Sequence, residues 1–354
     1  MLIMEHAVDD LAQRIRRARG VRLRPRGQRS RGLVEAGPAV EELSTLALQA
    51  PPRHEPSELV VTAAAGMPLV ELEALLAEAG QCLAFEPPRL GSGGTVGGMV
   101  ASGLAGPARM RSGPLRDAVL GVDLLNGRGE RLSFGGQVMK NVAGYDLSRL
   151  LAGSWGALGV ITSVSLKVGA IAPRQATLVF EMTQREALER LARWRCEPLP
   201  LEASTWGDED GTPRLHLRLA GGESSVEAAC RRLGGERQDD EAARARWRAI
   251  RDRRHGCLAR TERLWRVSLP PTTPPLALDA PTFVEWHGGL RWLDAAPDQG
   301  ERLQGLARDA GGRAQPPGRP AGLADSGAAR VQAALLEAFD PDGVFDRDPL
   351  AVAS

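Results

Sequence analysis

The sequence predicts an α+β protein of two domains, and three observations support this prediction. A chain of 354 residues is too long for one compact core and fits two. Residues 91–160 hold 17 of the 41 glycines, between segments with the composition of strands. After Pro173, strand and helix patterns alternate as in an antiparallel α+β domain. We therefore expect a first domain over 1–171 and a smaller second domain over 172–354.

The first domain begins with an amphipathic segment. Residues 5–19 space their apolar side chains as a short surface helix does, and Gly20 ends it. The run 22–32 is polar and rich in glycine and proline, so we expect turns there. Further along we expect a strand over 58–66, a helix over 67–80, and strands over 116–126, 130–135 and 159–169. A tight turn at 126–129 joins two of these strands as a hairpin.

The second domain alternates short strands with helices. We expect strands over 175–182, 199–206, 213–219, 264–270, 282–286 and 290–295, and helices over 184–195, 223–233 and 298–310. Glycine and proline fill residues 311–327, which predicts a loop or a disordered segment. A last helix over 328–338 precedes the motif FDPDGVF.

Charge and cysteine content exclude several classes of protein. The chain has 45 basic and 44 acidic residues, without the basic excess of a duplex-DNA binder. The four cysteines lie too far apart for a zinc knuckle or an iron–sulfur run, and they suit a reducing compartment. There is no apolar stretch of about 18 residues, and the N-terminus lacks the pattern of a signal peptide. We expect a cytoplasmic protein, or one held at the inner membrane through partners.

Glycine-rich loops form the candidate ligand site, because glycine lets the backbone approach a ligand closely. A P-loop needs Gly-Lys-Ser/Thr, and neither Lys140 nor Lys167 follows a glycine, which excludes that scheme. A Rossmann fingerprint needs G-x-G-x-x-G; Gly91 and Gly93 begin one, but position 96 is valine. The remaining scheme surrounds a pyrophosphate with backbone N–H groups from separate loops. The candidate loops are 24–32, 91–98 and 102–106.

The order of several motifs resembles the flavoproteins related to vanillyl-alcohol oxidase. These motifs are PRGQRSRG (25–32), EPPRLGSGGTVGGMVASGLAGP (86–107), KNVAGYDLSRLL (140–151) and FDPDGVF (339–345). Within that superfamily the chain is similar to the E subunits of bacterial glycolate oxidases, from about residue 20 to residue 346. The resemblance implies FAD as the cofactor. It also implies a two-subdomain PCMH-type FAD-binding domain followed by a smaller antiparallel α+β cap domain.

The resemblance further implies which residues surround the flavin. Around the pyrophosphate it places Pro25, Arg26, Gly27, Gln28, Arg29 and Ser30. Along the pyrophosphate and ribitol it places Pro88, Thr95, Gly97 and Gly98. Near the isoalloxazine ring it places Ser102, Gly103 and Gly106, and at the adenosine end Gly156, Gly159, Val160 and Ile161. Gln28 and Arg29 stand where the family commonly has small residues.

Simpler structural roles compete with these assignments. Thr95 suits the N-cap of a helix that starts at Val96, a role compatible with presenting N–H groups to a phosphate. Arg26 and Arg29 are more often surface charges in so arginine-rich a chain. Asp117 and Asp146 are more often turn or cap residues than catalytic acids.

None of the five histidines provides a ready catalytic or metal site. None lies in the first loop, so we expect non-covalent FAD, and no two have the spacing of metal ligands. The histidine-rich metal motif of some related 2-hydroxy-acid enzymes is also missing from the cap. His287 is the best single candidate for chemistry, although a packed histidine is the more common case. The sequence therefore names no base for the substrate hydroxyl and no cationic clamp for its carboxylate.

The leading hypothesis is an FAD-binding subunit of a multi-subunit 2-hydroxy-acid dehydrogenase, with glycolate as the substrate that the resemblance implies. Its partners would be a second flavin subunit and an iron–sulfur subunit, in a hetero-oligomer. One alternative is a self-sufficient flavin oxidase or dehydrogenase of another small alcohol or hydroxy acid, and another is a flavin-poor scaffold subunit. A partner is expected to meet the cap near Trp265, Trp286 and Trp292.

Overall fold

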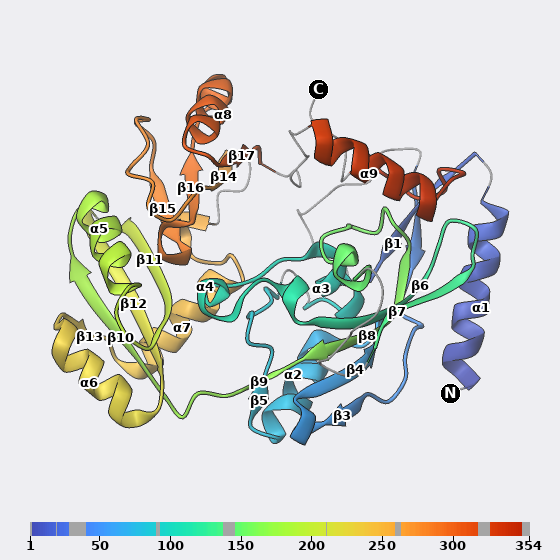
Figure 1. The fold of residues 1–354 in the computed structure, drawn as a ribbon, viewed down its shortest axis with the longest axis horizontal. Coiled ribbons are helices and arrows are strands. Elements are labelled where there is room, and N and C mark those ends of the chain that lie inside the picture. Colours follow the sequence, from blue (N-terminus) through green and yellow to red (C-terminus); the bar gives the residue numbers. More distant parts are fainter. Residues whose placement is uncertain are drawn as a thin grey trace. The chain divides into compact units, whose positions relative to one another are not determined.

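The computed structural model describes residues 2–18, 20–27, 40–89, 93–136, 146–209, 211–258, 263–317 and 326–348. They form two compact units (Figure 1). Unit 1 consists of Met1–Leu104, Pro114–Ile171 and Pro320–Ser354, and unit 2 of Ala105–Gly113 and Ala172–Arg319. Both combine helices with sheets, which confirms the α+β class.

Unit 1 is built on an antiparallel five-stranded sheet in the order β3-β4-β8-β6-β7. Its strands are β3 (Arg53–Glu55), β4 (Val60–Ala64), β6 (Val119–Leu125), β7 (Arg131–Gly135) and β8 (Val160–Lys167). Two small sheets pair β1 (Arg22–Arg26) with β2 (Val40–Ser44), and β5 (Gln81–Cys82) with β9 (Gly169–Ala170). The helices are α1 (Leu2–Arg17), α2 (Leu69–Glu78), α3 (Val96–Ser102) and α9 (Ser326–Phe339). The predicted hairpin is confirmed, because β6 and β7 pair directly through the turn at 126–129.

The chain end joins unit 1, and this corrects two predictions. Residues 22–26, expected as turns, form β1, and residues 320–354, expected in the second domain, belong to unit 1. A parallel bridge pairs Leu23 with Phe345, with backbone bonds of 2.7 Å from Leu23 N to Val344 O and 2.9 Å from Asp346 N to Leu23 O. Beside it, Arg24 Nε donates to Asp346 Oδ2 at 2.7 Å, and both side chains are buried. Pairing partners more than 300 residues away leave no local signal for a strand in this polar run.

The motif FDPDGVF forms a closed turn around Asp340. This carboxylate is fully buried and accepts the N–H groups of Val344 at 2.8 Å and Phe345 at 2.9 Å. The carbonyl of Phe339 accepts the N–H of Gly127 at 2.8 Å, which attaches the turn to the β6–β7 hairpin. The turn thus fixes the segment that pairs with β1.

Unit 2 is built on one antiparallel sheet of eight strands in the order β13-β10-β12-β11-β15-β16-β14-β17. The strands are β10 (Arg174–Glu181), β11 (Leu201–Glu209), β12 (Thr212–Gly221), β13 (Glu236–Arg237), β14 (Leu264–Ser268), β15 (Thr282–Glu285), β16 (Leu290–Asp294) and β17 (Arg313–Gln315). The helices are α4 (Arg109–Ser112), α5 (Gln184–Trp194), α6 (Glu223–Leu233), α7 (Asp240–Arg251) and α8 (Gly300–Asp309). Strand β17 lies inside the segment 311–327 that we expected as a loop, because its pairing with β14 is not local.

The sequence analysis missed α7, although its signals are present. Asp239 caps it by accepting the N–H groups of Glu241 at 3.0 Å and Ala242 at 2.9 Å. Its buried residues are Ala243, Trp247 and Ile250, at helical spacing. They share a core with Trp286 and Trp292, whereas α5 and α6 pack into a separate core with β10 and β12. The three tryptophans expected to meet a partner, Trp265, Trp286 and Trp292, are each at most 7% exposed, so that expectation is wrong.

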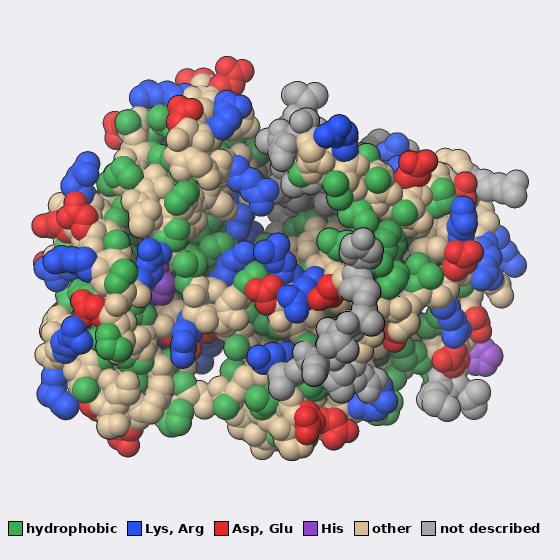
Figure 2. Space-filling model, viewed as in Figure 1, with side chains coloured by type: hydrophobic (Ala, Val, Ile, Leu, Met, Phe, Trp, Pro, Cys, Tyr) green, Lys and Arg blue, Asp and Glu red, His purple; other side chains and the backbone are tan. Residues whose placement is uncertain are grey.

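Charged side chains are interspersed on the surface. On the face drawn in Figure 2, basic and acidic groups alternate over both units, in keeping with the net charge of +1. Among the residues that the structure describes, no helix is both long and apolar enough to cross a membrane.

Three histidines of unit 2 are held in the neutral form by burial. Burial lowers the pKa of His216 to about 3, with a further contribution from the nearby Arg246 guanidinium. Burial lowers the pKa of His287 to about 4, with a contribution from Arg195, and the pKa of His255 is lowered in the same way by burial and Arg246. Their protonation therefore opposes folding.

We expect Asp340→Ala to lower the free energy of unfolding by about 2–4 kcal/mol, because it leaves two buried N–H groups without their charged acceptor. Thermal and urea unfolding of unit 1 measure this loss. Asp342→Ala, an exposed position in the same turn, is the matched control and should stay within about 0.5 kcal/mol of the parent. Equal losses in both variants would contradict the role of the buried carboxylate.

We expect unit 2 to lose stability as the pH falls from about 6.5 towards 4. A histidine whose pKa is lowered by folding binds its proton more readily in the unfolded chain, at a cost of up to about 1.4 kcal/mol per pH unit. Six of the seven tryptophans lie in unit 2, so tryptophan fluorescence follows its unfolding. His216→Asn should flatten the pH dependence, whereas His6→Asn, on the exposed side of α1, should leave it unchanged.

Candidate functional site

Three segments that are distant in the sequence meet in unit 1. At the end of β1, a Cβ placed on Gly27 would overlap the side-chain oxygen of Thr95. Pro25, on the same strand, lies against the loop that follows η3 (Ser148–Leu151): a Cβ on Gly156 would come within 3.0 Å of Pro25 Cδ. The first loop therefore touches both the 93–98 segment and the 153–159 segment, as the resemblance implies for a single ligand site.

Thr95 caps helix α3, and the cap uses the first N–H groups of the helix internally. Its hydroxyl oxygen accepts the N–H of Gly98 at 3.2 Å. The N–H groups of Val96 and Gly97 donate to the carbonyls of Met67 at 3.0 Å and Ala65 at 2.8 Å. The expected presentation of these donors to a phosphate is wrong, because the connection between β4 and α2 already satisfies two of them and the cap satisfies the third.

Several of the predicted glycines are explained by packing. A Cβ on Gly97 would come within 2.7 Å of the Cβ of Ala65, and one on Gly103 within 2.8 Å of the backbone nitrogen of Gly153. A Cβ on Gly159 would come within 2.5 Å of the carbonyl oxygen of Leu125. These three positions hold α3, the 153–159 segment and β8 close to their neighbours.

Gly98 has no such reason to be glycine. It is exposed, it has an ordinary helical conformation, and a Cβ there would meet only its own cap, Thr95 Oγ1, at 3.3 Å. A glycine inside a helix costs about 1 kcal/mol relative to alanine. Nearby, a Cβ on Gly94 or Gly153 would meet nothing within 4 Å. Backbone exposed in this way leaves room for a ligand in direct contact with the chain, and these residues fit an extended dinucleotide.

The other predicted residues fall into three groups. Gln28, Arg29 and Ser30 lie outside the described residues. In unit 1, Pro88 is half-buried, Ser102 Oγ donates to the carbonyl of Met99 at 2.9 Å, and the side chains of Val160 and Ile161 are buried on β8. Gly106 belongs to unit 2, where its carbonyl accepts Trp286 Nε1 at 3.0 Å.

The charged residues of unit 1 that we weighed have structural partners. Arg26 forms an ion pair with Glu42 across β1 and β2. Asp146 accepts Ser148 Oγ and Arg149 Nε, both at 2.7 Å. Asp117 is half-exposed and lies 3.8 Å from Arg149.

Unit 2 contains a basic cluster that the sequence analysis missed, formed by Arg109, Arg253, Arg266 and Arg313 with Glu285. Arg109 and Arg266 stack on Trp286, with guanidinium carbons 4.7 and 5.3 Å from the ring centroid. Arg253 stacks on Trp292 at 5.1 Å. The members come from separate stretches of the chain, so no local sequence pattern predicts that they form a cluster. The pairing of β14, β15, β16 and β17 brings Arg266, Glu285 and Arg313 together. Arg109 on α4 and Arg253 after α7 join them by stacking on Trp286 and Trp292.

The cluster concentrates positive charge in a buried place. Burial, together with the like charges of Arg253, Arg109 and Arg313, lowers the pKa of Arg266 to about 9, against the raising effect of Glu285. Glu285 Oε1 accepts Trp292 Nε1 at 2.7 Å. Such an arrangement favours an anion in contact with the guanidinium groups, which supply fixed pairs of donors to a carboxylate.

The backbone beside the cluster is strained. Trp286, His287 and Arg253 have φ of 54°, 53° and 53°. Residues other than glycine rarely adopt such values. His287 itself is buried, with its N–H donated to Ser204 Oγ at 3.1 Å. It matches the packed histidine that we considered more common.

Comparisons with known proteins agree with this picture. A family model described as an FAD binding domain matches residues 3–135. Glycolate oxidase subunit GlcE of Escherichia coli (strain K12) is 43% identical over 300 residues, which cover 83% of this chain and 82% of that protein. Glycolate oxidase subunit GlcD of Bacillus subtilis (strain 168) is 38% identical over 74 residues, 21% of this chain and 16% of that protein. The mitochondrial D-lactate dehydrogenase [cytochrome] of Arabidopsis thaliana is 36% identical over 106 residues, 30% of this chain and 18% of that protein.

The fold has a solved counterpart. A structure of alkyldihydroxyacetonephosphate synthase superposes with a TM-score of 0.64 at 14% identity, covering 97% of this chain and 74% of that one. This likeness concerns the fold alone. The match to GlcE extends over four-fifths of both chains, and FAD is the cofactor of the matched domain. The chain therefore belongs to the GlcE family of glycolate oxidase subunits, within the FAD-binding oxidoreductases of the PCMH type.

Proposed function

We propose that this chain is the FAD-binding subunit of a multi-subunit 2-hydroxy-acid dehydrogenase that oxidises glycolate. The observation that carries the proposal is Gly98, an exposed helical glycine that neither packing nor backbone conformation requires. Family membership and the meeting of the first loop with the 93–98 and 153–159 segments support FAD as the molecule that fills the open space beside Gly98. The absence of histidine and cysteine from residues 24–32 supports non-covalent attachment.

Bound FAD would supply the acceptor for the two electrons of the substrate. The chain itself would hold the flavin through the backbone of the 93–98 segment, with Pro25 and Gly27 closing one side. Gly153 and Gly156, on the third segment, would meet the adenosine end together with the backbone of β8. All of these assigned residues belong to unit 1.

The basic cluster of unit 2 provides the carboxylate clamp that the sequence did not reveal. Arg109 follows Gly106 by three residues, and both lie next to Trp286. A 2-hydroxy acid carries one carboxylate beside the carbon that is oxidised, so a clamp orients that carbon. Glu285 is the single carboxylate among the charges acting on Arg266, and its burial suits it to accept a proton from the substrate hydroxyl. This cluster favours substrate binding by this chain over pure electron relay.

Partner subunits remain part of the proposal. The four cysteines are free and lie far apart in the sequence, so iron–sulfur clusters would have to be carried by another chain. The local similarity to GlcD supports a second flavin subunit of related sequence. The free thiols are typical of a protein in the reducing cytoplasm. Any attachment to the inner membrane would be through a partner.

We expect Gly98→Val to weaken FAD binding by about 10–1,000-fold, because the branched side chain fills the open space beside the exposed backbone of α3 that the flavin would occupy. Flavin absorbance after reconstitution and titration measures the affinity. Gly305→Val is the matched control: it also replaces an exposed-side helical glycine whose Cβ would meet nothing, on α8 of unit 2. Folded Gly98→Val protein with full flavin occupancy would overturn the placement of the loop.

We expect Arg109→Gln to weaken glycolate binding by about 10–100-fold, since a hydrogen bond to a charged group contributes about 1.5–3 kcal/mol. Calorimetric titration of the flavin-loaded chain with glycolate measures this directly. Arg111→Gln, exposed on the same short helix, should bind glycolate as the parent does. If the parent chain binds no glycolate, the clamp is wrong and substrate oxidation belongs to a partner.

A further inference from the structure

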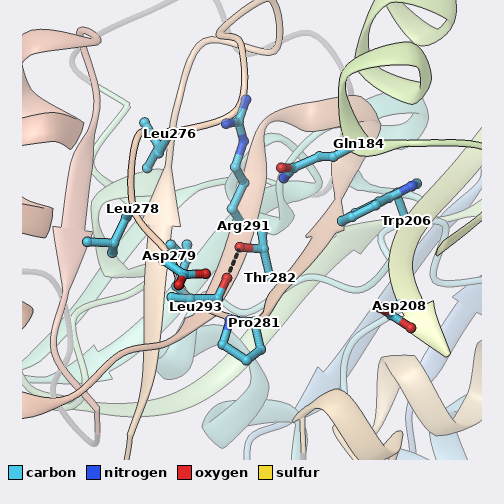
Figure 3. Close-up of a pocket in the computed structure, with 11 residues that line it drawn as sticks. Gln184, Trp206, Asp208, Leu276, Leu278, Asp279, Pro281, Thr282, Arg291 and Leu293 are labelled. Atoms are coloured by element: carbon cyan, nitrogen blue, oxygen red, sulfur yellow. Dashed lines mark hydrogen bonds between the residues drawn. The ribbon is translucent and has the colours of Figure 1, made fainter. Parts of the chain in front are cut away.

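Unit 2 contains a pocket beside β15 and β16, where Arg291 and Leu293 alternate along β16 with Trp292, on which Arg253 of the basic cluster stacks. It has a volume of about 540 Å³, within the range of small-molecule sites. Figure 3 shows the residues that line it. They come from the start of α5, from β11, from the 276–281 connection, and from β15 and β16. None of them belongs to the basic cluster or to the predicted flavin residues.

The pocket contains a buried arginine that has no acidic partner among the residues that the structure describes. Arg291 is 0% exposed, and its Nη1 donates to the carbonyl of Pro274 at 2.7 Å, while Nη2 donates to the carbonyl of Thr273. Nε is buried and has no hydrogen-bond partner among the described residues. Burial alone lowers the pKa of this guanidinium to about 10, without a contribution from any carboxylate. The group therefore stays charged at neutral pH, with only neutral acceptors around it.

The rest of the lining suits a molecule with an apolar body. Leu276, Leu278 and Leu293 form one wall, and the ring of Trp206 forms another, held by its Nε1 bond of 2.9 Å to the carbonyl of Met182. Figure 3 shows the amide of Gln184 pointing towards Arg291. An amide N–H₂ at this place can donate to an anion that the charge of Arg291 attracts.

Two acidic residues restrict the charge of the occupant. Asp208 and Asp279 line the pocket and are exposed, and Figure 3 places Asp208 at the end away from the Arg291 guanidinium. A ligand with a second negative charge would meet these carboxylates, whereas a single negative charge can lie at the arginine end.

We propose that this pocket is a second small-molecule site, separate from the oxidation chemistry, that binds a monocarboxylate with an apolar body. The carboxylate accepts from the Gln184 amide and is attracted by the uncompensated charge of the Arg291 guanidinium, whose own donors stay buried. The apolar body lies between the leucine wall and Trp206. The bonds from Arg291 to residues 273 and 274 couple the occupant to the connection that forms the pocket edge.

The test uses the full chain loaded with FAD and 4-phenylbutyrate as the probe, with binding followed by calorimetry. We expect saturable binding of one molecule per chain, and at least about tenfold weaker binding of the uncharged 4-phenylbutyramide. Gln184→Glu places a negative charge against the probe and should weaken binding at least about tenfold. Gln175→Glu, the same change at an exposed position of β10 outside the pocket, should leave it unchanged.

A second variant guards against indirect effects. Leu278→Trp fills the pocket from its half-buried edge and should abolish probe binding while the flavin spectrum stays that of the parent. Absence of saturable binding to the parent chain would overturn the proposal, and so would equal binding of the acid and the amide. Binding that survives both Gln184→Glu and Leu278→Trp would place the probe elsewhere and would also overturn it. None of these outcomes depends on glycolate, so they leave the proposed function to its own tests.

Discussion

The buried ion pair between Arg24 and Asp346 is the interaction on which the arrangement of unit 1 depends. Removal of one partner from a buried ion pair leaves the other charge buried and isolated, which costs about 3–5 kcal/mol. Here the pair lies beside the Leu23–Phe345 bridge, so charge, backbone and apolar contacts hold β1 to the chain end together. Strand β1 then brings Pro25, and Gly27 just after it, against the 153–159 and 93–98 segments.

The two candidate sites of the protein are built by opposite means. In unit 1 the site consists of backbone, and side chains are excluded from it: Gly98 keeps a surface open, and Thr95 secures the helix start. In unit 2 the basic cluster consists of long charged side chains stacked on tryptophan rings, over a backbone strained at Trp286 and His287. Cation–π stacking spreads the cost of burying several like charges and fixes the orientation of the guanidinium planes. A flexible clamp would lose that orientation.

The sequence predicted the parts of the molecule whose signals are local. The helix over 223–233 and the β6–β7 hairpin follow from apolar spacing and turn residues, and the family motifs identified the cofactor. Strand β1 escaped prediction because its run is polar, although its partner β2 is near in the sequence, and β17 escaped because its partner β14 lies far away in the chain. The arginine cluster escaped for a compositional reason: where almost every basic residue is arginine, only position in the fold separates a functional guanidinium from a surface one. The role of Gly97 changed for a related reason, since its need for glycine lies in the neighbouring strand at Ala65.

The closure of unit 1 by residues 339–346 has a consequence for biosynthesis. A ribosome delivers the chain from the N-terminus, and domains generally fold as they emerge. The strand that leads into the first flavin loop acquires its buried counter-ion only when Asp346 leaves the exit tunnel, after all of unit 2 has been made. Unit 2 can therefore fold during translation before β1 acquires its pairing with the segment around Phe345, so the fold of unit 1 is completed after that of unit 2.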